Sequence, residues 1–152
     1  MKKIIIIFVG SFLLNACSKV PITGRIRVNL VGDSQVLPAS FAQYKGFLTE
    51  NKLSTDIEMT GQIKTVGAKI SGAVDRFMRA NKMLSEANSY QWEFNLIEDE
   101  MLNAWCMPGG KVIFYSGIMP ICANDNGIAA VMGHEVAHAF AKHGQERMTT
   151  SY

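Results

Sequence analysis

The chain has 152 residues, a length typical of one domain. Apolar residues make up 48% of it and charged residues 18%, which excludes a disordered chain, collagen and a coiled coil. Fifteen Lys and Arg against thirteen Asp and Glu give a net charge of +2, and without Lys2 and Lys3 the counts are 13 and 13. The charge therefore gives no indication of a nucleic-acid partner, and we expect none.

Residues 1–16 are typical of a secretory leader. A basic head, Met1-Lys2-Lys3, precedes an uncharged run over residues 4–14 with the sequence IIIIFVGSFLL. A transmembrane helix needs roughly 20 apolar residues, so this run is too short to span a bilayer but fits a signal peptide.

Cys17 follows this leader in a context that resembles the lipobox of bacterial lipoproteins, Leu-Asn-Ala-Cys. The cysteine would be acylated and become the new N-terminus, and several acyl chains anchor a protein firmly. Ser18, in place of an acidic residue, favours the outer membrane by resemblance to bacterial lipoproteins. We therefore predict a chain that is anchored in a bacterial cell envelope and faces the periplasm. An ordinary signal peptide cut after Ala16 is the alternative.

The next elements are expected in the following order. Residues 17–30 read as a lipidated tether followed by a short strand that begins at Arg25. Helices are predicted from Asp33 to about Thr49 and over 56–80, the second with a capping box formed by Thr55 and Glu58. Apolar residues alternate at Trp92, Phe94 and Leu96, which predicts a strand with one solvent-exposed face.

The second half of the chain predicts a hairpin and a final helix. Strands are expected over 103–107 and 111–115, joined by a turn at Pro108-Gly109-Gly110. A helix should follow over 127–143, with a cap among residues 124–126 and a stop at Gly144. The predicted fold class is α+β, with helices packed on a small sheet.

Cys106 and Cys122 each lie in an apolar, strand-like run. An oxidising compartment permits a disulfide between them. Free cysteine also behaves as a small hydrophobic residue, so we favour two buried thiols.

The final helix contains His134-Glu135-Val136-Ala137-His138, an HExxH motif. Two histidines four residues apart lie on one helical face, about 6 Å apart at Cβ, and can bind one ion. Imidazole nitrogens suit Zn²⁺, and Glu135 is close enough to take a proton from a water on the metal without being a ligand. The spacing therefore predicts one Zn²⁺ per chain, held by His134 and His138, with Glu135 as the catalytic base of peptide hydrolysis. Apolar neighbours suggest that the motif is buried, where unpaired polar groups are costly. Hydrogen-bonded core histidines are the alternative.

His143 is not expected to bind the metal. At 100° per residue it points some 140° away from His138. The longer motif with a third histidine would need glycine at 141 and histidine at 144, and the chain has Ala141 and Gly144. We therefore place His143 at the surface or behind the ligands.

Residues 103–148 resemble the HtpX and CAAX-prenyl-protease family of gluzincin metallopeptidases, through NA, PGGK and AAVMGHEVAHAFAKHGQER. The chain looks most like the bacterial lipoprotein branch of the BepA and LoiP type and the related mitochondrial inner-membrane protease. The resemblance extends over roughly residues 20–152, and it implies a zincin-like fold and a zinc endopeptidase that degrades misfolded envelope proteins. It also implies that an extended polypeptide substrate lies against an edge strand. This edge strand would consist of Lys111, Val112, Ile113, Phe114 and Tyr115.

The third zinc ligand in this family is a glutamate on a later helix. Glu146 is the only carboxylate after the motif in the 152 residues, and we expect it to face elsewhere. Residues 31–152 are therefore interpreted as the N-terminal part of a zinc metallopeptidase domain. Residues 18–152 alone should bind zinc weakly, show no peptidase activity and expose apolar surface along 128–140. A catalytically inactive envelope lipoprotein that binds clients or partners is the alternative function.

Overall fold

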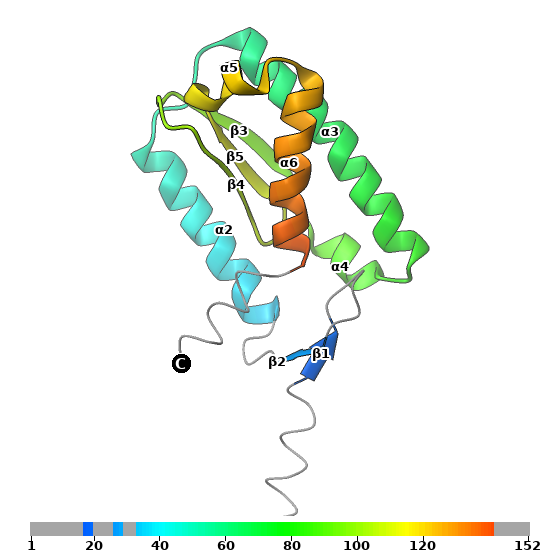
Figure 1. Ribbon diagram of the computed structural model, residues 1–152. Coiled ribbons are helices and arrows are strands. Elements are labelled where there is room, and N and C mark those ends of the chain that lie inside the picture. Colours follow the sequence, from blue (N-terminus) through cyan, green and yellow to red (C-terminus); the bar gives the residue numbers. More distant parts are fainter. Residues whose placement is uncertain (1–16, 20–25, 29–32, 142–152) are drawn as a thin grey trace, which may run out of the picture.

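The computed structural model describes residues 17–19, 26–28 and 33–141 (Figure 1). A three-stranded sheet lies between helices on both of its faces. The elements in chain order are β1 (Cys17–Lys19), β2 (Ile26–Val28), α2 (Asp33–Glu50), α3 (Ile57–Ala80), α4 (Leu84–Ser89), β3 (Glu93–Ile97), β4 (Ala104–Met107), β5 (Lys111–Tyr115), the 3₁₀ turn η1 (Ser116–Ile118), α5 (Met119–Cys122) and α6 (Asp125–Phe140). The α+β class is confirmed.

The sheet has the order β3-β5-β4, so β5 is its middle strand. β3 runs parallel to β5, with Glu93 opposite Lys111, and β4 runs antiparallel to it, with Trp105 opposite Ile113. The predicted hairpin over 103–115 is confirmed as β4 and β5. Gly109 and Gly110 both have a φ of +86° in its turn, a conformation that side-chain-bearing residues avoid.

Helices α3 and α6 cover one face of the sheet and form the larger part of the core with it. Gly67 of α3 contacts the ring of Phe94, since a Cβ at this glycine would lie 2.6 Å from ring carbons. The missing side chain therefore allows α3 to approach β3 closely. The fully buried side chains on this face include Ile63, Leu96, Val112, Phe114, Ile128 and Met132.

Helix α2 covers the other face, which corrects the expectation that the second face of β3 is open to solvent. Asn95 donates from Nδ2 to Tyr44 Oη of α2 at 2.9 Å, and Lys111 Nζ lies 3.2 Å from Glu93 Oε2. Lys111 is only 8% exposed, and its ammonium lies 5.2 Å from the ring centre of Phe41. The polar residues of β3 are thus half-buried because α2 supplies hydrogen-bonding and aromatic partners for them. Burial raises the pKa of Tyr44, whose hydroxyl stays protonated at neutral pH.

Helix α3 begins at Ile57 and is capped by Asp56, not by the predicted pair Thr55 and Glu58. Asp56 accepts a hydrogen bond from the backbone N–H of Met59 at 2.8 Å. A carboxylate caps a helix N-terminus well because it accepts N–H bonds and its charge opposes the helix dipole. Ser54 Oγ in turn accepts from the N–H of Asp56 at 3.2 Å, which orients the cap.

Two further expectations need correction. The sequence predicts Cys17–Lys19 in the tether, but this segment pairs antiparallel with Ile26–Val28, because two extended segments this close in sequence can satisfy each other's backbone groups. The sequence also predicts Cys122 in a strand-like run, but this residue ends the short helix α5, because Pro120 in the first helical turn has no N–H to leave unpaired.

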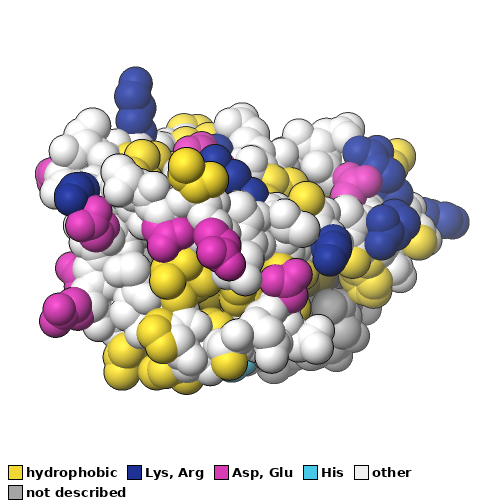
Figure 2. Space-filling model, turned by 90° about the horizontal axis from the view of Figure 1, so that it is seen from above, with side chains coloured by type: hydrophobic (Ala, Val, Ile, Leu, Met, Phe, Trp, Pro, Cys, Tyr) yellow, Lys and Arg dark blue, Asp and Glu magenta, His cyan; other side chains and the backbone are white. Residues whose placement is uncertain are grey.

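The surface mixes charges of both signs. Figure 2 shows one end of the molecule from above, where acidic and basic side chains are interspersed with hydrophobic ones. This agrees with the nearly balanced charge counts of the sequence. No helix in the described part of the chain has the length and apolar character needed to cross a membrane.

Candidate active site

Helix α6 carries the whole HExxH motif. Of the three cap candidates the structure selects Asn124, whose Oδ1 accepts from the N–H groups of Asn126 and Gly127 at 2.9 and 3.2 Å. The helix begins at Asp125, two residues earlier than predicted, and is assigned as far as Phe140. The predicted stop at Gly144 lies outside the described residues.

The apolar face of α6 is buried against the sheet and α3, and the histidines lie on its exposed side. The buried residues of the helix are Ile128, Met132, Val136, Ala139 and Phe140. His134 and His138 are exposed and Glu135 is half-buried. The expectation that the motif is buried is therefore wrong for the histidines, because the helix turns them away from its packed face. Since the imidazoles are exposed, the argument from the cost of burying an unpaired polar group does not apply to them. The alternative that they are hydrogen-bonded core residues is also excluded.

The two imidazoles converge on one point. Nε2 of His134 and Nε2 of His138 are 2.9 Å apart, and the rings are perpendicular with centres 4.4 Å apart. Two nitrogens bound tetrahedrally to Zn²⁺ at about 2.05 Å would be about 3.3 Å apart, so a small side-chain rotation suffices. The donor set fits zinc: two imidazole nitrogens lie close together on one helical face.

Glu135 lies on α6, the helix that packs against β4. Burial raises the pKa of the Cys106 thiol on β4 to about 12, and the negative charge of Glu135 contributes to this rise. Glu135 itself is half-buried, on the helix that packs against this strand. A base at this position is suited to act on a peptide bound along β4.

Strand 111–115 is not the edge strand, and this prediction is wrong. β5 pairs with β3 on one side and with β4 on the other, so both of its backbone edges are occupied. All five of its residues are buried. In the described part of the chain, the open edge beside α6 belongs to β4 (Ala104–Met107).

The pairing of β4 shows which of its backbone groups face outward. Tyr115 N–H donates to Asn103 C=O, and Gly110 N–H donates to Met107 C=O, each at 3.2 Å. Backbone groups of successive residues alternate between the two sides of a strand, so Asn103, Trp105 and Met107 face β5. Ala104 and Cys106 therefore face outward. The N–H and C=O of Cys106 are directed where an added strand would pair.

Among residues 17–19, 26–28 and 33–141, no group of three His, Cys, Asp or Glu side chains is arranged to hold a metal. Of the residues predicted to bind zinc, His134 and His138 are both among the described residues. His143 and Glu146, the other residues considered near the motif, lie outside the described residues.

An apolar groove runs between α3 and α6, on the flank of the HExxH helix. It has a volume of about 310 Å³ and nearly all of its exposed lining is apolar. This agrees with the expected apolar surface along 128–140. The lining residues are Ile70, Ala73, Val74, Phe77, Gly133, Val136, Ala137 and Phe140.

Cys106 and Cys122 are both free thiols, as favoured from the sequence, and Cys122 is buried as expected, whereas Cys106 is half-buried. Sequence reasoning missed that the backbone of Cys106, like that of Ala104, faces outward from the edge strand. The signal was present in the strand that follows: Val112–Tyr115 is apolar at every position, which is typical of a strand covered on both faces.

Comparisons with known proteins agree with this geometry. A family model described as peptidase family M48 matches residues 66–152. The mitochondrial metalloendopeptidase OMA1 of Saccharomyces cerevisiae is 31% identical over 143 residues, 91% of this chain and 41% of its own length. Metalloprotease YcaL of Escherichia coli is 45% identical over 51 residues, 34% of this chain and 20% of its own. The beta-barrel assembly-enhancing protease of Yersinia pestis is 29% identical over 65 residues, 41% of this chain and 13% of its own. The chain thus spans less than half the length of these relatives.

Proposed function

The chain belongs to peptidase family M48, and from this membership and the geometry of α6 we propose that it acts as a zinc-dependent metalloendopeptidase. The observation that carries the proposal is the convergence of His134 Nε2 and His138 Nε2, 2.9 Å apart, on the helix that packs against β4, a strand at the edge of the sheet. Together with Glu135, these histidines would supply two zinc ligands and a general base for hydrolysis of an extended peptide bound at the neighbouring strand.

His134 and His138 would hold the metal. When bound, zinc supplies Lewis-acid polarisation of the scissile carbonyl and of the attacking water. Glu135 takes a proton from that water as its oxygen attacks the carbonyl carbon. It then gives the proton to the amine nitrogen that leaves when the C–N bond breaks. The carboxylate is regenerated at the end of the cycle, and water has been added across one peptide bond.

The substrate is a polypeptide in extended conformation, bound by strand addition to β4. The outward N–H and C=O of Cys106 would hold the main chain, which gives affinity for any sequence. Glu135 then lies next to the bound main chain. This replaces strand 111–115 as the proposed substrate edge.

Cys17 is proposed as a lipidation site after a lipoprotein signal peptide over 1–16. The protein would then be anchored in a bacterial cell envelope, at the outer membrane and facing the periplasm, and would degrade misfolded or misassembled envelope proteins. The leader sequence supports this, together with the relatives from Yersinia pestis and Escherichia coli. A mitochondrial relative also matches, so the compartment depends on the leader.

The second candidate function is a non-catalytic lipoprotein that binds clients along the same edge. It is favoured by one observation, that the described residues supply two metal ligands and not three.

The test uses the full-length gene product with casein as substrate and measures bound zinc and cleavage rate together. Glu135→Gln should keep the metal but lower turnover by about 10²–10⁴, because an amide cannot accept the proton. His134→Ala should lose both zinc and activity. Asp125→Asn, which also neutralises a carboxylate on α6, is the matched control and should retain both. Wild-type turnover in Glu135→Gln would refute the role of Glu135, and a zinc-free, inactive wild type would favour the binding lipoprotein.

A further inference from the structure

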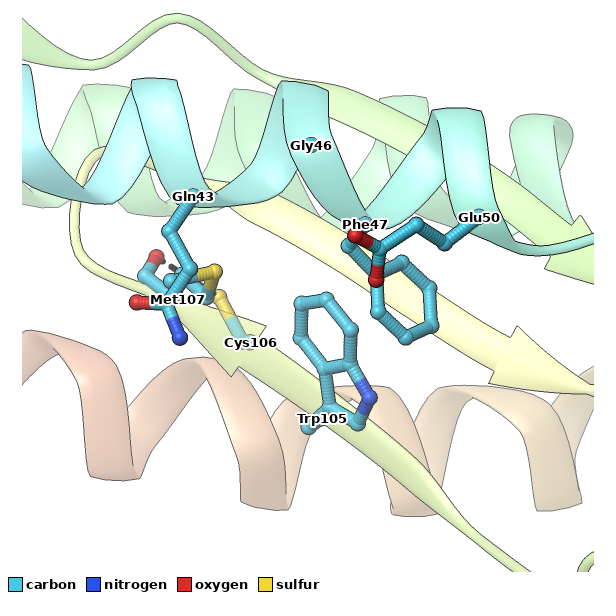
Figure 3. Close-up of a pocket in the computed structure, with 7 residues that line it drawn as sticks. All are labelled: Gln43, Gly46, Phe47, Glu50, Trp105, Cys106 and Met107. Carbon is cyan, nitrogen blue, oxygen red and sulfur yellow. Dashed lines mark hydrogen bonds between the residues drawn. The ribbon is translucent and has the colours of Figure 1, made fainter.

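A second cavity, of about 540 Å³, lies between α2 and β4 (Figure 3). It opens at the sheet edge that is proposed to bind substrate, but on the side of α2. Its lining residues are Gln43, Gly46, Phe47 and Glu50 of α2 with Trp105, Cys106 and Met107 of β4. The cavity therefore adjoins the peptide edge without being part of the histidine site.

The walls of this α2–β4 pocket are aromatic and fixed in place. The rings of Phe47 and Trp105 meet edge to face with centres 5.0 Å apart. Trp105 Nε1–H also donates to Tyr115 Oη at 3.3 Å, which holds the indole in one orientation. A preformed aromatic wall binds an aliphatic chain or a cation with little loss of side-chain entropy.

Glu50 places a negative charge at the rim of this pocket. In Figure 3 its carboxylate lies beside Phe47, on the side of the pocket where Trp105 also lies. Glu50 is exposed, and no Lys or Arg of the described residues forms an ion pair with it.

The helix end itself adds to this negative potential. Glu50 is the last residue of α2, and the last turn contains no basic residue. Only neutral side chains satisfy the nearby carbonyls: Thr49 Oγ1 donates to Gly46 C=O at 2.7 Å, and Asn51 Nδ2 donates to Phe47 C=O at 2.8 Å. A carboxylate at the negative end of a helix dipole is unfavourable, and a cation bound there removes the penalty.

The register of β4 decides which substrate side chains reach the pocket. A peptide residue opposite Cys106 would exchange main-chain hydrogen bonds with it, and its side chain would lie on the α6 side. The two neighbouring residues would lie opposite Trp105 and Met107, with their side chains on the α2 side. The pocket therefore receives a side chain one residue away from those that face the histidines.

We propose that the α2–β4 pocket is a specificity subsite that binds a lysine or arginine side chain of an extended substrate, and that Glu50 determines this preference. The proposal rests on the proposed peptidase function. The aliphatic stem lies against Trp105 and Phe47, and the charged end reaches the carboxylate of Glu50.

The test uses the full-length protein and pairs of quenched fluorescent peptides that differ at one position, arginine against norleucine, with this position moved along the peptide. The ratio of kcat/KM for arginine to that for norleucine should exceed one at one register. Glu50→Gln should lower this ratio about two- to fivefold, the range of exposed ion pairs, and Glu50→Lys should make a glutamate peptide the better substrate. Glu58→Gln, an exposed carboxylate at the start of α3, is the matched control and should leave the ratio unchanged. An unaltered ratio in both Glu50 variants would overturn the proposal.

Binding separates this proposal from the proposed function. Fluorescence anisotropy of the same peptides with Glu135→Gln, and with the double variant that adds Glu50→Gln, measures the subsite without cleavage. A preference for arginine that the second substitution removes supports the subsite even if the wild type cleaves no peptide. Cleavage by the wild type without any dependence on Glu50 refutes the subsite and leaves the peptidase function intact.

Discussion

Replacing Gly67 with alanine should destabilise the protein, although the same change at Gly61 of the same helix should stabilise it. Both glycines lie within α3, where alanine is favoured over glycine by about 1 kcal/mol. Their surroundings differ. A Cβ at Gly61 would have no atom within 4 Å, whereas a Cβ at Gly67 would lie 2.6–2.7 Å from three ring carbons of Phe94.

The size of the effect follows from this overlap. Carbon atoms are in favourable contact at about 3.5–4.0 Å, so the Phe94 ring has to move by about 1 Å. It cannot do so freely, because it stacks on Trp92 with ring centres 6.0 Å apart. Overpacking of this kind costs about 1–3 kcal/mol, and the upper end applies here. After the gain in helix propensity, Gly67→Ala should be about 2 kcal/mol less stable than wild type, and Gly61→Ala about 1 kcal/mol more stable.

Urea denaturation followed by tryptophan fluorescence measures both variants, and Trp92 reports directly on this contact. The midpoints should move in opposite directions while the slope with urea stays constant. Should Gly67→Ala prove as stable as Gly61→Ala, the close approach of α3 to β3 would be refuted. Hydrogen exchange in α3 would then show whether the helix had moved.

Three further outcomes are expected. Cys17→Ser should abolish labelling with a radioactive fatty acid, and unchanged label would restore the ordinary signal peptide. The Cys106 thiol should react with maleimide at pH 8 far more slowly in the folded protein than in urea, because its pKa of about 12 keeps it protonated. A fast reaction in the folded state would contradict the burial of this thiol. Since its pKa in the folded state lies above the unfolded value, the protonated thiol favours the folded state at neutral pH, and this contribution to stability is lost as the pH rises from about 9 to about 12. Residues 18–152 alone should bind Zn²⁺ more weakly than the full-length gene product in isothermal titration, because the described residues supply only two imidazoles. Tight one-to-one binding would instead indicate a third ligand from Glu146, His143 or a second copy of the chain.

Features that depend on neighbouring residues can be predicted well. Helix α3 is expected over 56–80 and spans Ile57–Ala80, because its apolar residues recur with the period of a helix. The pairing of His134 with His138 follows from the same geometry, since residues four apart share a face whatever the helix packs against. The Asn124 cap is among three candidates because its position next to the helix start is also local.

Strand order cannot be predicted in the same way. A hairpin over 103–115 does not say which of its strands pairs with a third, and that choice depends on β3, whose partner lies 18 residues further along the chain. The sequence pattern wrongly predicts that the polar face of β3 is exposed to solvent, for the same reason. Its Asn95 is paired with Tyr44, a residue 51 positions away on a helix whose own pattern gives no sign of this contact. Both errors concern contacts between distant segments.

The proposed site has two parts, the HExxH motif and the substrate-binding surface, and the sequence predicts the first much better than the second. The histidines and Glu135 are contained within five residues of one helix, so the motif specifies them almost alone. The peptide edge and the α2–β4 pocket need α2, β4 and α6 to be brought together by the fold, and no short motif encodes that arrangement. Because β5 pairs with β3 on one side and β4 on the other, the proposed substrate edge is β4, which contains Trp105 and Cys106 and packs against the helix of Glu135. The candidate catalytic residues can thus be proposed from the motif alone, whereas substrate preference has to be sought in the residues that only the structure brings to that edge.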